Sequence, residues 1–486
     1  MGVSPSTQTT PLKSTSYGSG SSGGSHSKAL FTAGAFAHSP LAKRFNESDD
    51  GVLTADKALP LLEQEGAPRM SNLQTGLNLI NNYVGMVLLS VHYCFAEAGW
   101  LGMLVLALLT AFGAWTGELI IVSYDTLAAE GEKNPSYLQI GERCLGPFGK
   151  WLVLWSSIIE TFFAILCMDI IIWSNAALFL PGVPLGWVIA GCVVLSFPTN
   201  YLRDFSLLSF LSAFGIGCIV LIVAVVVFEV GTLLASAGPG AFAHMDLAQP
   251  SGLPISVSIM LAGLTGHVSL PPIYAEMKTP SAFRPTLYLS FAVMFLFYAA
   301  VAGCGYLLYG EGASVLITQD MGNAGGDSVL SHILIQLVNL GITFKLYCSV
   351  PTCVVVLVDI AQNLYLDSKG VQLSDGATDA VRFVLWGLTV LGSIATYTSL
   401  KYVTALIGIN SMLISVLLPI LFYIILHGKQ MTRSHRAVLA AIVAFSVCLT
   451  LVITYVDFLE FLGSLADLAD SDEADDALGE ATPDGP

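Results

Sequence analysis

Apolar runs of about 20 residues recur along the chain between residues 72 and 458, and short polar stretches separate them. A helix needs about 20 predominantly apolar residues to cross the hydrocarbon core of a bilayer. The pattern therefore predicts eleven membrane-spanning helices, of which the fourth is short and the eighth is long. The predicted segments are 72–96, 100–124, 151–178, 187–201, 205–231, 253–275, 286–309, 329–364, 381–399, 402–426 and 437–458.

Composition and the placement of basic residues support this division. Of the 486 residues, 54% are hydrophobic and only 11% are charged, which is far from the balance of a soluble domain. With the N-terminus in the cytosol, 17 of the 19 lysine and arginine residues fall in the N-terminal segment or in inward-facing loops, as the positive-inside rule requires. Only Lys401 falls outside, and Lys345 lies within the eighth span. We therefore expect a cytosolic N-terminus and a luminal or extracellular C-terminus.

The two ends of the chain lack a sustained apolar pattern. Residues 1–70 include the run "STSYGSGSSGGSHS", which has too little apolar surface to offset the entropy of ordering, so we expect a disordered cytosolic segment there. Residues 71–460 then form the transmembrane domain, and residues 461–486 form an acidic disordered tail that contributes much of the net charge of −16. The stretch "DKALPLL" resembles an acidic dileucine sorting signal, which makes trafficking adaptors candidate partners of the N-terminal segment.

Motifs that carry enzyme chemistry are missing from the sequence. Eight of the nine cysteines lie within predicted spans, and cysteines and histidines do not cluster at the spacing of metal ligands. No glycine-rich loop precedes a lysine in the manner of a phosphate-binding loop, and the loops leave no room for a separate soluble domain. We therefore expect no enzymatic activity, no cofactor or metal and no nucleic-acid partner.

Residues that weaken a helix interrupt the first predicted span, "NNYVGMVLLSVHYCFAEAGW". Gly85 follows Asn81 and precedes Met86 and Ser90. Within a bilayer, an unwound backbone is tolerated only where it lines a cavity or is buried in protein. Transporters use such breaks to present the ends of half-helices to a substrate near the midplane. The first span is therefore predicted to be broken near Gly85.

A second break is predicted in "MLAGLTGHVSLPPIYAEM", within the sixth span. Gly263, Thr265, Gly266 and His267 interrupt the apolar run there, ahead of two prolines. Glycine and proline are frequent in membrane helices in general, so either break alone is weak support for a site. The two breaks occupy corresponding positions if spans 1–5 and 6–10 form two repeats, and this match favours a functional interpretation.

Several other motifs accompany the two broken spans, namely "SYLQIGERCLGPFGKW", "GYLLYGEGASVLITQDM", "IIET" in the third span and "FSLLS" at the fifth. Together they resemble the amino acid/auxin permease (AAAP) family over roughly residues 72–460. Within that family the chain is most similar to the branch of vesicular inhibitory and vacuolar amino acid transporters. His92 stands where proline is usual and Cys94 where alanine is usual, so the resemblance does not fix the substrate.

The resemblance implies an all-α polytopic protein with a LeuT-like fold, in which two inverted repeats of five helices surround broken helices 1 and 6. It also implies transport of amino acids by alternating access. Backbone amides near Gly85 and Met86 suit the carboxylate of an amino acid, because they lie at the positive end of a half-helix. Carbonyl groups freed between Gly263 and Gly266 suit its ammonium group. Asn81 and Ser90 complete the predicted substrate site, together with Thr265 and His267.

Lys345 is the most informative single residue of the eighth span. An ionised lysine near the bilayer centre is costly and usually functional. In sodium-coupled relatives, the positions that Asn81 and Thr343 resemble supply sodium ligands, and a cationic lysine beside them would repel sodium. We therefore expect Lys345 to take part in proton coupling. The alternative is a structural ion pair with Glu160 or Asp169 of the third span or with Asp359 of the same span.

Other ionisable residues within the spans have two interpretations. His92 and His267 could relay protons, but each is more simply explained as a hydrogen-bonded helix residue or a wall of the substrate pocket. Glu118 and Glu160 are intramembrane carboxylates of the kind that more often join helices than carry ions.

Two classes of function remain after these exclusions. The first is a proton-coupled carrier of neutral amino acids, with a vacuolar, lysosomal or vesicular membrane favoured over the plasma membrane. The second is an amino acid sensor on the same fold that signals through the N-terminal segment. Flux against a concentration gradient distinguishes the two.

Overall fold

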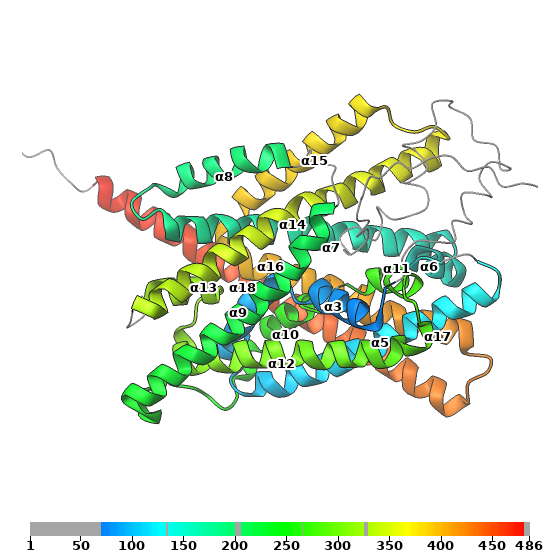
Figure 1. Cartoon of the computed structure of the whole chain (residues 1–486), viewed down its shortest axis with the longest axis horizontal. Coiled ribbons are helices and arrows are strands. Elements are labelled where there is room, and N and C mark those ends of the chain that lie inside the picture. The colour runs from blue at the N-terminus through cyan, green and yellow to red at the C-terminus, as the bar shows by residue number, and fades with distance from the viewer. Residues whose placement is uncertain (1–69, 133–134, 200–205, 265, 325–328, 481–486) are drawn as a thin grey trace, which may run out of the picture.

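The computed structural model describes residues 70–132, 135–199, 206–264, 266–324 and 329–480, and these residues form a bundle of helices without a β-sheet (Figure 1). In Figure 1, α8 and α15 lie along the upper edge of the bundle, and α5 and α12 lie along its lower edge. The long helices are α5 (Leu101–Ala129), α7 (Pro147–Phe179), α9 (Ser206–Ala237), α12 (Phe283–Tyr309), α14 (Val329–Lys369), α15 (Asp375–Ala395) and α18 (Arg433–Glu480). The shorter ones are α3 (Asn72–Tyr83), α4 (Val91–Ala98), α6 (Tyr137–Leu145), α8 (Leu185–Thr199), α10 (Leu253–Ala262), α11 (Leu270–Ala275), α13 (Ile317–Ala324), α16 (Leu400–Ser411) and α17 (Leu418–His427).

Nine helical segments of the described residues are long and apolar enough to cross a membrane. They match nine of the eleven segments that hydropathy predicts. The other two predicted spans correspond to the short apolar helix α8 and to the interrupted series α3, η2 (Met86–Leu89) and α4. The chain is therefore an all-helical membrane protein with at least nine candidate spans.

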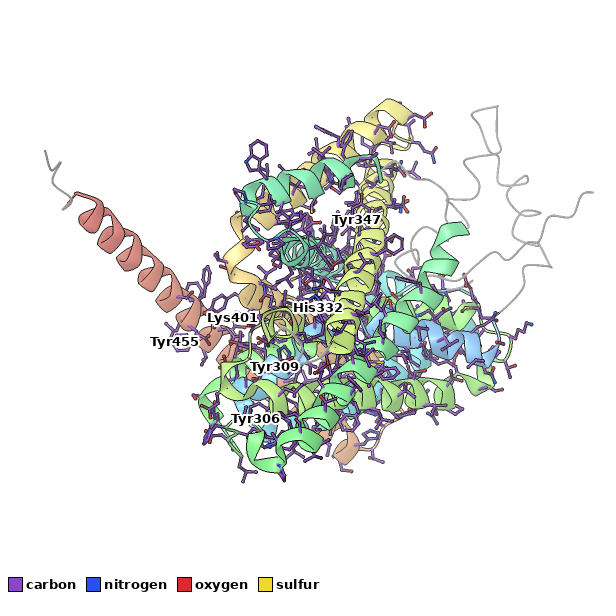
Figure 2. All side chains as sticks on the ribbon, turned by 60° about the vertical axis from the view of Figure 1, so that its left-hand side comes forward. Tyr306, Tyr309, His332, Tyr347, Lys401 and Tyr455 are labelled. Carbon is purple, nitrogen blue, oxygen red and sulfur yellow. The ribbon has the colours of Figure 1, made fainter. Side chains whose placement is uncertain are left out.

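Helix boundaries depart from the predicted ones at the C-terminal end. α18 continues to Glu480, past residue 460, where the acidic tail is predicted to begin. Alanine and leucine residues alternate with the carboxylates in this stretch, and both are strong helix formers. Figure 2 shows this part of α18 leading away from the bundle beyond Tyr455. Residues 1–69, the predicted N-terminal segment apart from Met70, and residues 481–486 lie outside the described part of the chain.

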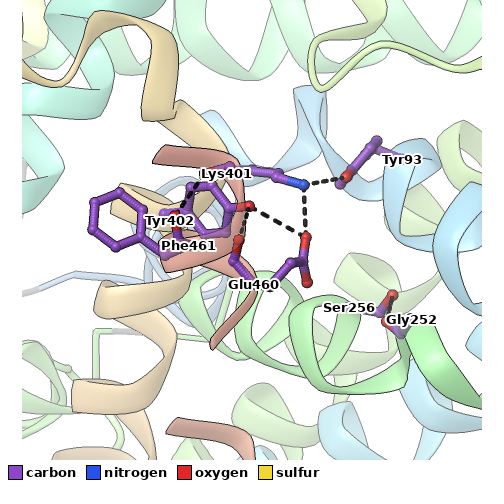
Figure 3. A network of polar contacts seen from close by, with 8 residues as sticks. Tyr93, Gly252, Ser256, Lys401, Tyr402, Glu460 and Phe461 are labelled. Carbon is purple, nitrogen blue, oxygen red and sulfur yellow. Dashed lines mark hydrogen bonds and ion pairs between the residues drawn. The ribbon is translucent and has the colours of Figure 1, made fainter. Parts of the chain in front are cut away.

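A polar network fastens α18 to the bundle before it leaves (Figure 3). Lys401 Nζ of α16 lies 2.7 Å from Glu460 Oε1 of α18 and 3.4 Å from the hydroxyl oxygen of Tyr93 of α4. The Tyr402 hydroxyl donates to the main-chain oxygen of Glu460 at 3.3 Å, and an alternative acceptor, Glu460 Oε1, lies 3.4 Å away. Lys401, the lone basic residue predicted on the outer side, is thus paired with a carboxylate.

The first and sixth spans are both broken, as predicted. α3, which begins with a capping box between Ser71 and Gln74, ends at Tyr83, and the chain resumes in η2 and α4. α10 ends at Ala262, and the chain resumes in η5 (His267–Ser269) and α11. The inner parts of both spans are joined, because Met70 accepts a hydrogen bond from Lys278 N and donates one to Glu276 O.

Helix packing surrounds these two broken spans. α12 packs against α3, α4, α5 and α9, whereas α10 packs against α4, α5 and α16. α7 packs against α8, α14 and α16, and α14 packs against α9 and α15. α17 packs against α5. Together these contacts enclose both breaks within the protein, which is where an unwound backbone can be accommodated.

Candidate functional site

The break in the first span frees a main-chain oxygen. In a continuous helix Leu88 N–H would donate to Val84 O, but here it donates to Gly85 O at 3.3 Å. Gly85 is the residue before η2, with φ −117° and ψ −135°, and Met86 is the first residue of that helix. The amides at the start of a helix have no acceptor within it. The break thus leaves the Val84 carbonyl group and the first amides of η2 without partners inside a helix.

Lys345 of α14 is the hydrogen-bond donor to the freed carbonyl oxygen of Val84. Its Nζ donates to Val84 O at 3.2 Å. Asn81 lies beside it, because a Cβ atom added to Gly215 of α9 would lie 2.9 Å from Asn81 Oδ1 and 3.0 Å from Lys345 Cε. Asn81 Oδ1 is buried and has no hydrogen-bond partner among the described residues. Because Gly215 has no side chain, it leaves room for the side chains of both Asn81 and Lys345.

The lysine has no carboxylate partner in the part of the chain that the structure describes. Of the three carboxylates considered, Asp169 accepts a hydrogen bond from the Ser393 hydroxyl at 3.3 Å, Asp359 interacts electrostatically with Arg382, and Glu160 has an enclosed oxygen, Oε2, without a partner. The contacts of Lys345 thus give no support to the alternative of a structural ion pair with one of these three carboxylates. Thr343 does not reach the lysine through a hydrogen bond, since its hydroxyl donates to Asn339 O at 2.7 Å.

A small cavity of about 20 Å³ adjoins Lys345 and the first break. This volume holds about one water molecule. Three of the predicted site residues, Gly85, Met86 and Lys345, line it, and the remaining lining comes from apolar residues of η2, α9 and α14. Ser90, Gly263, Gly266 and His267 are not among the lining residues. The described conformation is therefore closed around this position.

The break in the sixth span requires glycine at Gly266. Its φ of +131° is a conformation that residues with a side chain rarely adopt, and a Cβ there would lie 2.4 Å from Asn82 Nδ2. Asn82 Nδ2 donates to Gly266 O at 3.4 Å and so links the first break to the sixth. Thr265 lies outside the described residues.

Tyr298 of α12 joins the two breaks a second time. Its hydroxyl donates to Tyr83 O at 3.0 Å, with Gly263 O at 3.3 Å as a second acceptor. Tyr298 is buried, so this hydroxyl is withdrawn from solvent. The two unwound segments are thus held side by side, which the sequence could not indicate.

His267 is bound within the protein on both ring nitrogens. Nε2 lies 3.1 Å from Gly113 O and 3.1 Å from the Thr116 hydroxyl, both of α5. Because a carbonyl oxygen only accepts, Nε2 carries a proton, and Nδ1 of the neutral ring can accept from the Tyr83 hydroxyl at 3.4 Å. His267 therefore fixes the break against the second span. This geometry favours a structural role over the proton relay.

The outer half of the first span contains a buried pair that sequence reasoning missed. His92 Nε2 lies 2.9 Å from Asp320 Oδ2 of α13, and the two side chains are 0% and 8% exposed. Both oxygens of Asp320 also accept from Ser314 N at 3.0 Å. A second bond, from the Thr318 hydroxyl to Asn175 Oδ1 at 2.7 Å, ties α13 to α7. α13 thus closes over the outer half of the first span.

The remaining residues of interest have ordinary structural contacts. Ser90 is buried, and its main-chain oxygen accepts from Cys94 N at 3.4 Å. Glu118 accepts hydrogen bonds from the Arg284 guanidinium and, at 2.7 Å, from the Tyr288 hydroxyl. Glu118 therefore joins α5 to α12, in agreement with the simpler of its two interpretations.

Comparisons with known proteins agree with this architecture. A family model described as "Transmembrane amino acid transporter protein" matches residues 68–459. Amino acid transporter AVT1E of Arabidopsis thaliana is 27% identical over 393 residues, which cover 77% of this chain and 70% of the relative. The vesicular inhibitory amino acid transporter of Xenopus laevis is 22% identical, with 76% and 73% covered. A mutant of the manganese transporter of Eremococcus coleocola aligns in structure with a TM-score of 0.52 and 13% identity over 80% of this chain and 87% of that chain, a likeness of fold alone.

Proposed function

Because the chain belongs to the family of transmembrane amino acid transporter proteins and is an integral multi-pass membrane protein, we propose that it is a proton-coupled carrier of neutral amino acids. In this proposal it works by alternating access, and its two broken spans form the substrate site.

The proposed architecture is eleven spans, of which the first ten form two inverted repeats of five. Packing supports it, because contacts within one half have counterparts in the other. α7 with α8 corresponds to α14 with α15, and α9 with α14 corresponds to α16 with α7. α12 with α9 corresponds to α5 with α17, and α12 with α4 corresponds to α5 with α11. Such a repeat places the two breaks at equivalent positions near the midplane.

The proposed substrate lies between the two breaks. The Met86 amide would bind its carboxylate, joined by the Gly85 amide once that amide leaves Tyr83 O, to which it donates at 3.0 Å in the described conformation. Carbonyl groups at Gly263 and Gly266 would bind its ammonium group. This pairing needs no charged side chain for either end, which suits a neutral amino acid. Since the cavity beside Gly85 is water-sized, binding requires a conformation in which the spans around it have moved apart.

Lys345 carries the proposal of proton coupling. Its ammonium group donates to Val84 O, the carbonyl group that the first break frees, and lies beside the unpartnered Asn81 Oδ1. Carbonyl and amide oxygens are the ligands that a small cation prefers. The ammonium group thus stands where a bound cation would hold the break. Losing its proton would release that hold, whereas binding a proton would restore it.

A vacuolar or vesicular membrane is the proposed location. Support comes from the similarity to a relative whose name includes the word vesicular and from the dileucine-like stretch before the first span. An acidic lumen would supply the proton gradient that the coupling uses.

The experiment is uptake of a panel of radiolabelled amino acids into proteoliposomes, with a pH gradient imposed in either direction and with sodium present or absent. The wild-type protein is expected to accumulate neutral amino acids under the gradient regardless of sodium. In Lys345→Met, gradient-driven uptake is expected to fall at least tenfold. Lys345→Arg keeps a charge that cannot be released at neutral pH, so it is expected to bind substrate without responding to the gradient.

Lys401→Met is the matched control, because Lys401 pairs with Glu460 at the outer end and touches neither break. It is expected to keep the response to pH. Gradient-driven uptake that survives in Lys345→Met would contradict the coupling role. Saturable binding without flux in the wild-type protein would instead favour the sensor.

A further inference from the structure

Glu160 of α7 is a half-buried carboxyl group with one enclosed oxygen, Oε2, and the proposed cycle does not yet use it. We propose that Glu160 is a second proton-binding residue of the transport cycle, separate from Lys345. This inference rests on the proposed proton coupling and extends it to the interface of the third and tenth spans.

Glu160 lacks the kind of partner that Glu118 and Asp169 have. Its Oε2 is fully enclosed and accepts no hydrogen bond from the described residues. Glu118 is paired with an arginine, and Asp169 accepts from a serine hydroxyl. An ionised carboxylate buried without a cation or a donor is strongly destabilising. A neutral carboxylic acid removes that cost, so Glu160 is suited to hold a proton in the described conformation.

The surroundings of Glu160 are polar and incompletely hydrogen-bonded. Two contacts bracket it along the interface of α7 and α16. The Ser156 hydroxyl donates to Asn410 Oδ1, and the Cys167 sulfur lies 3.5 Å from the Thr404 hydroxyl. Ser411, the residue after Asn410, has a buried hydroxyl group without a partner in the described part of the chain. A hydroxyl group can accept a hydrogen bond from a protonated carboxyl group or donate one to a carboxylate.

An irregular helix follows this interface. η9 (Met412–Leu417) is a π-helix, and such segments occur frequently at functional sites. It contains Ser415, which is also buried with an unpartnered hydroxyl group. η9 packs against α7 on one side and against η5, at the sixth break, on another. η9 therefore connects α7, the helix that carries Glu160, to one of the two breaks.

The titratable groups that face Glu160 are tyrosines. Tyr83 at the first break and Tyr137 of α6 both interact with it electrostatically. The charged groups of the other packed helices have other partners. Lys345 of α14 donates a hydrogen bond to Val84 O and interacts electrostatically with Cys218. Lys401 of α16 is paired with Glu460, and Asp320 of α13 is paired with His92. Asp359 of α14 interacts electrostatically with Arg382 of α15, and Cys192 of α8 interacts electrostatically with Asp169. No cation among the described residues neutralises Glu160.

The proposed step is a simple proton exchange. As the protein opens toward one side, the O–H bond of the Glu160 carboxyl breaks, its proton passes to water, and a carboxylate remains. As the protein opens toward the other side, water returns a proton to the oxygen and the neutral acid forms again. No electrons are exchanged, and each turn of this step moves one proton.

The test uses the purified full-length protein in proteoliposomes and a panel of radiolabelled neutral amino acids as the probe. Two activities are compared, namely exchange across membranes at equal pH and accumulation driven by a pH gradient. Glu160→Gln mimics the neutral acid permanently. Its exchange activity is expected to stay within about twofold of the wild type. Its gradient-driven accumulation is expected to fall at least fivefold. Glu160→Asp is expected to restore the response to the gradient with a displaced pH profile.

Asp169→Asn is the matched control on the same helix, since its carboxylate already has a donor, and it is expected to respond to pH as the wild type does. A wild-type response of Glu160→Gln would overturn the inference, as would an equal loss of response in Asp169→Asn. Loss of exchange together with accumulation in a monodisperse Glu160→Gln protein would also overturn it, because it would place the residue on the substrate instead. Failure of the wild-type protein to respond to the gradient would refute the proposed proton coupling itself and is distinguishable from these outcomes.

Discussion

At the scale of single residues, one hydroxyl group connects the two unwound segments. Tyr298 reaches Tyr83 O of the first break and Gly263 O of the sixth from a third helix, α12. Main-chain oxygens freed by a break must find donors when water is absent. The Tyr298 hydroxyl therefore offers a donor to one main-chain oxygen at each break and links the two segments.

Replacing Tyr298 by phenylalanine should weaken the site without unfolding the protein. The loss of one buried hydrogen bond costs about 1 kcal/mol, which corresponds to about a fivefold change in an equilibrium constant. We expect KM for amino acid uptake to rise by about that factor. Tyr288→Phe is the control, since it removes a hydroxyl from the same helix where that hydroxyl meets Glu118 instead of a break. An unchanged KM in Tyr298→Phe, or an equal rise in both variants, would contradict this role.

Some of these residues could be predicted from the sequence and others could not. Asn81, Gly85, Gly263 and Gly266 stand out because such residues are conspicuous in an apolar segment. Lys345 stands out for its charge. Tyr298 gives no such signal, since a tyrosine is unremarkable in a membrane helix and its importance depends on contacts 35 and 215 positions away in the sequence. Asp320 lies in the polar stretch between two predicted spans, so its pairing with His92 was equally hidden.

At the scale of elements, the sixth and tenth spans approach each other closely. A Cβ atom added to Gly408 of α16 would lie 1.7 Å from the main-chain oxygen of Ser258 in α10. That oxygen belongs to the backbone and cannot rotate away. Gly408 therefore sets the contact between the half-helix before the sixth break and the span that carries the π-helix.

Substitution of Gly408 by alanine should force these two helices apart. Overpacking of this kind typically costs about 1–3 kcal/mol, and displacement of backbone adds to it. We expect Gly408→Ala to lower the melting temperature of the purified protein by several degrees and to reduce uptake. Gly387→Ala in α15 is the control, because a Cβ there meets nothing within 4 Å and alanine favours a helix. Equal melting temperatures for Gly408→Ala and the wild type would show that the contact is not as close as described.

Broken spans were more predictable than the packing around them. In lipid, a glycine-rich interruption is costly enough to stand out in a single sequence, so the positions of both breaks could be read in advance. The π-helix η9 could not, since "MLISVL" has the composition of any apolar helix. The close approach at Gly408 likewise depends on which helices are neighbours, and hydropathy carries no such information.

At the scale of the whole molecule, hydropathy predicted nine spans that the structure confirms as long apolar helices, because the bilayer fixes the length of a helix that crosses it. The placement of basic residues predicts which side each loop faces, and that orientation stays a prediction. The pairwise correspondence of packing between the two halves could not be read from the sequence, which has no clear residue-level repeat. In the described conformation, access to the first break is restricted at two places. α13 covers the outer half of the first span through His92 and Asp320, and the cavity beside Lys345 is water-sized.

The central claim is that movement of an amino acid through the two broken spans is coupled to movement of protons. The most direct test is simultaneous measurement of both fluxes in proteoliposomes that contain a trapped pH-sensitive dye, with neutral amino acids added outside and with no sodium present. Coupling predicts that each substrate that is taken up also changes the internal pH, in a fixed ratio that is maintained as substrate concentration varies. Amino acid uptake without any change of internal pH, or uptake that begins only when sodium is added, would contradict the claim.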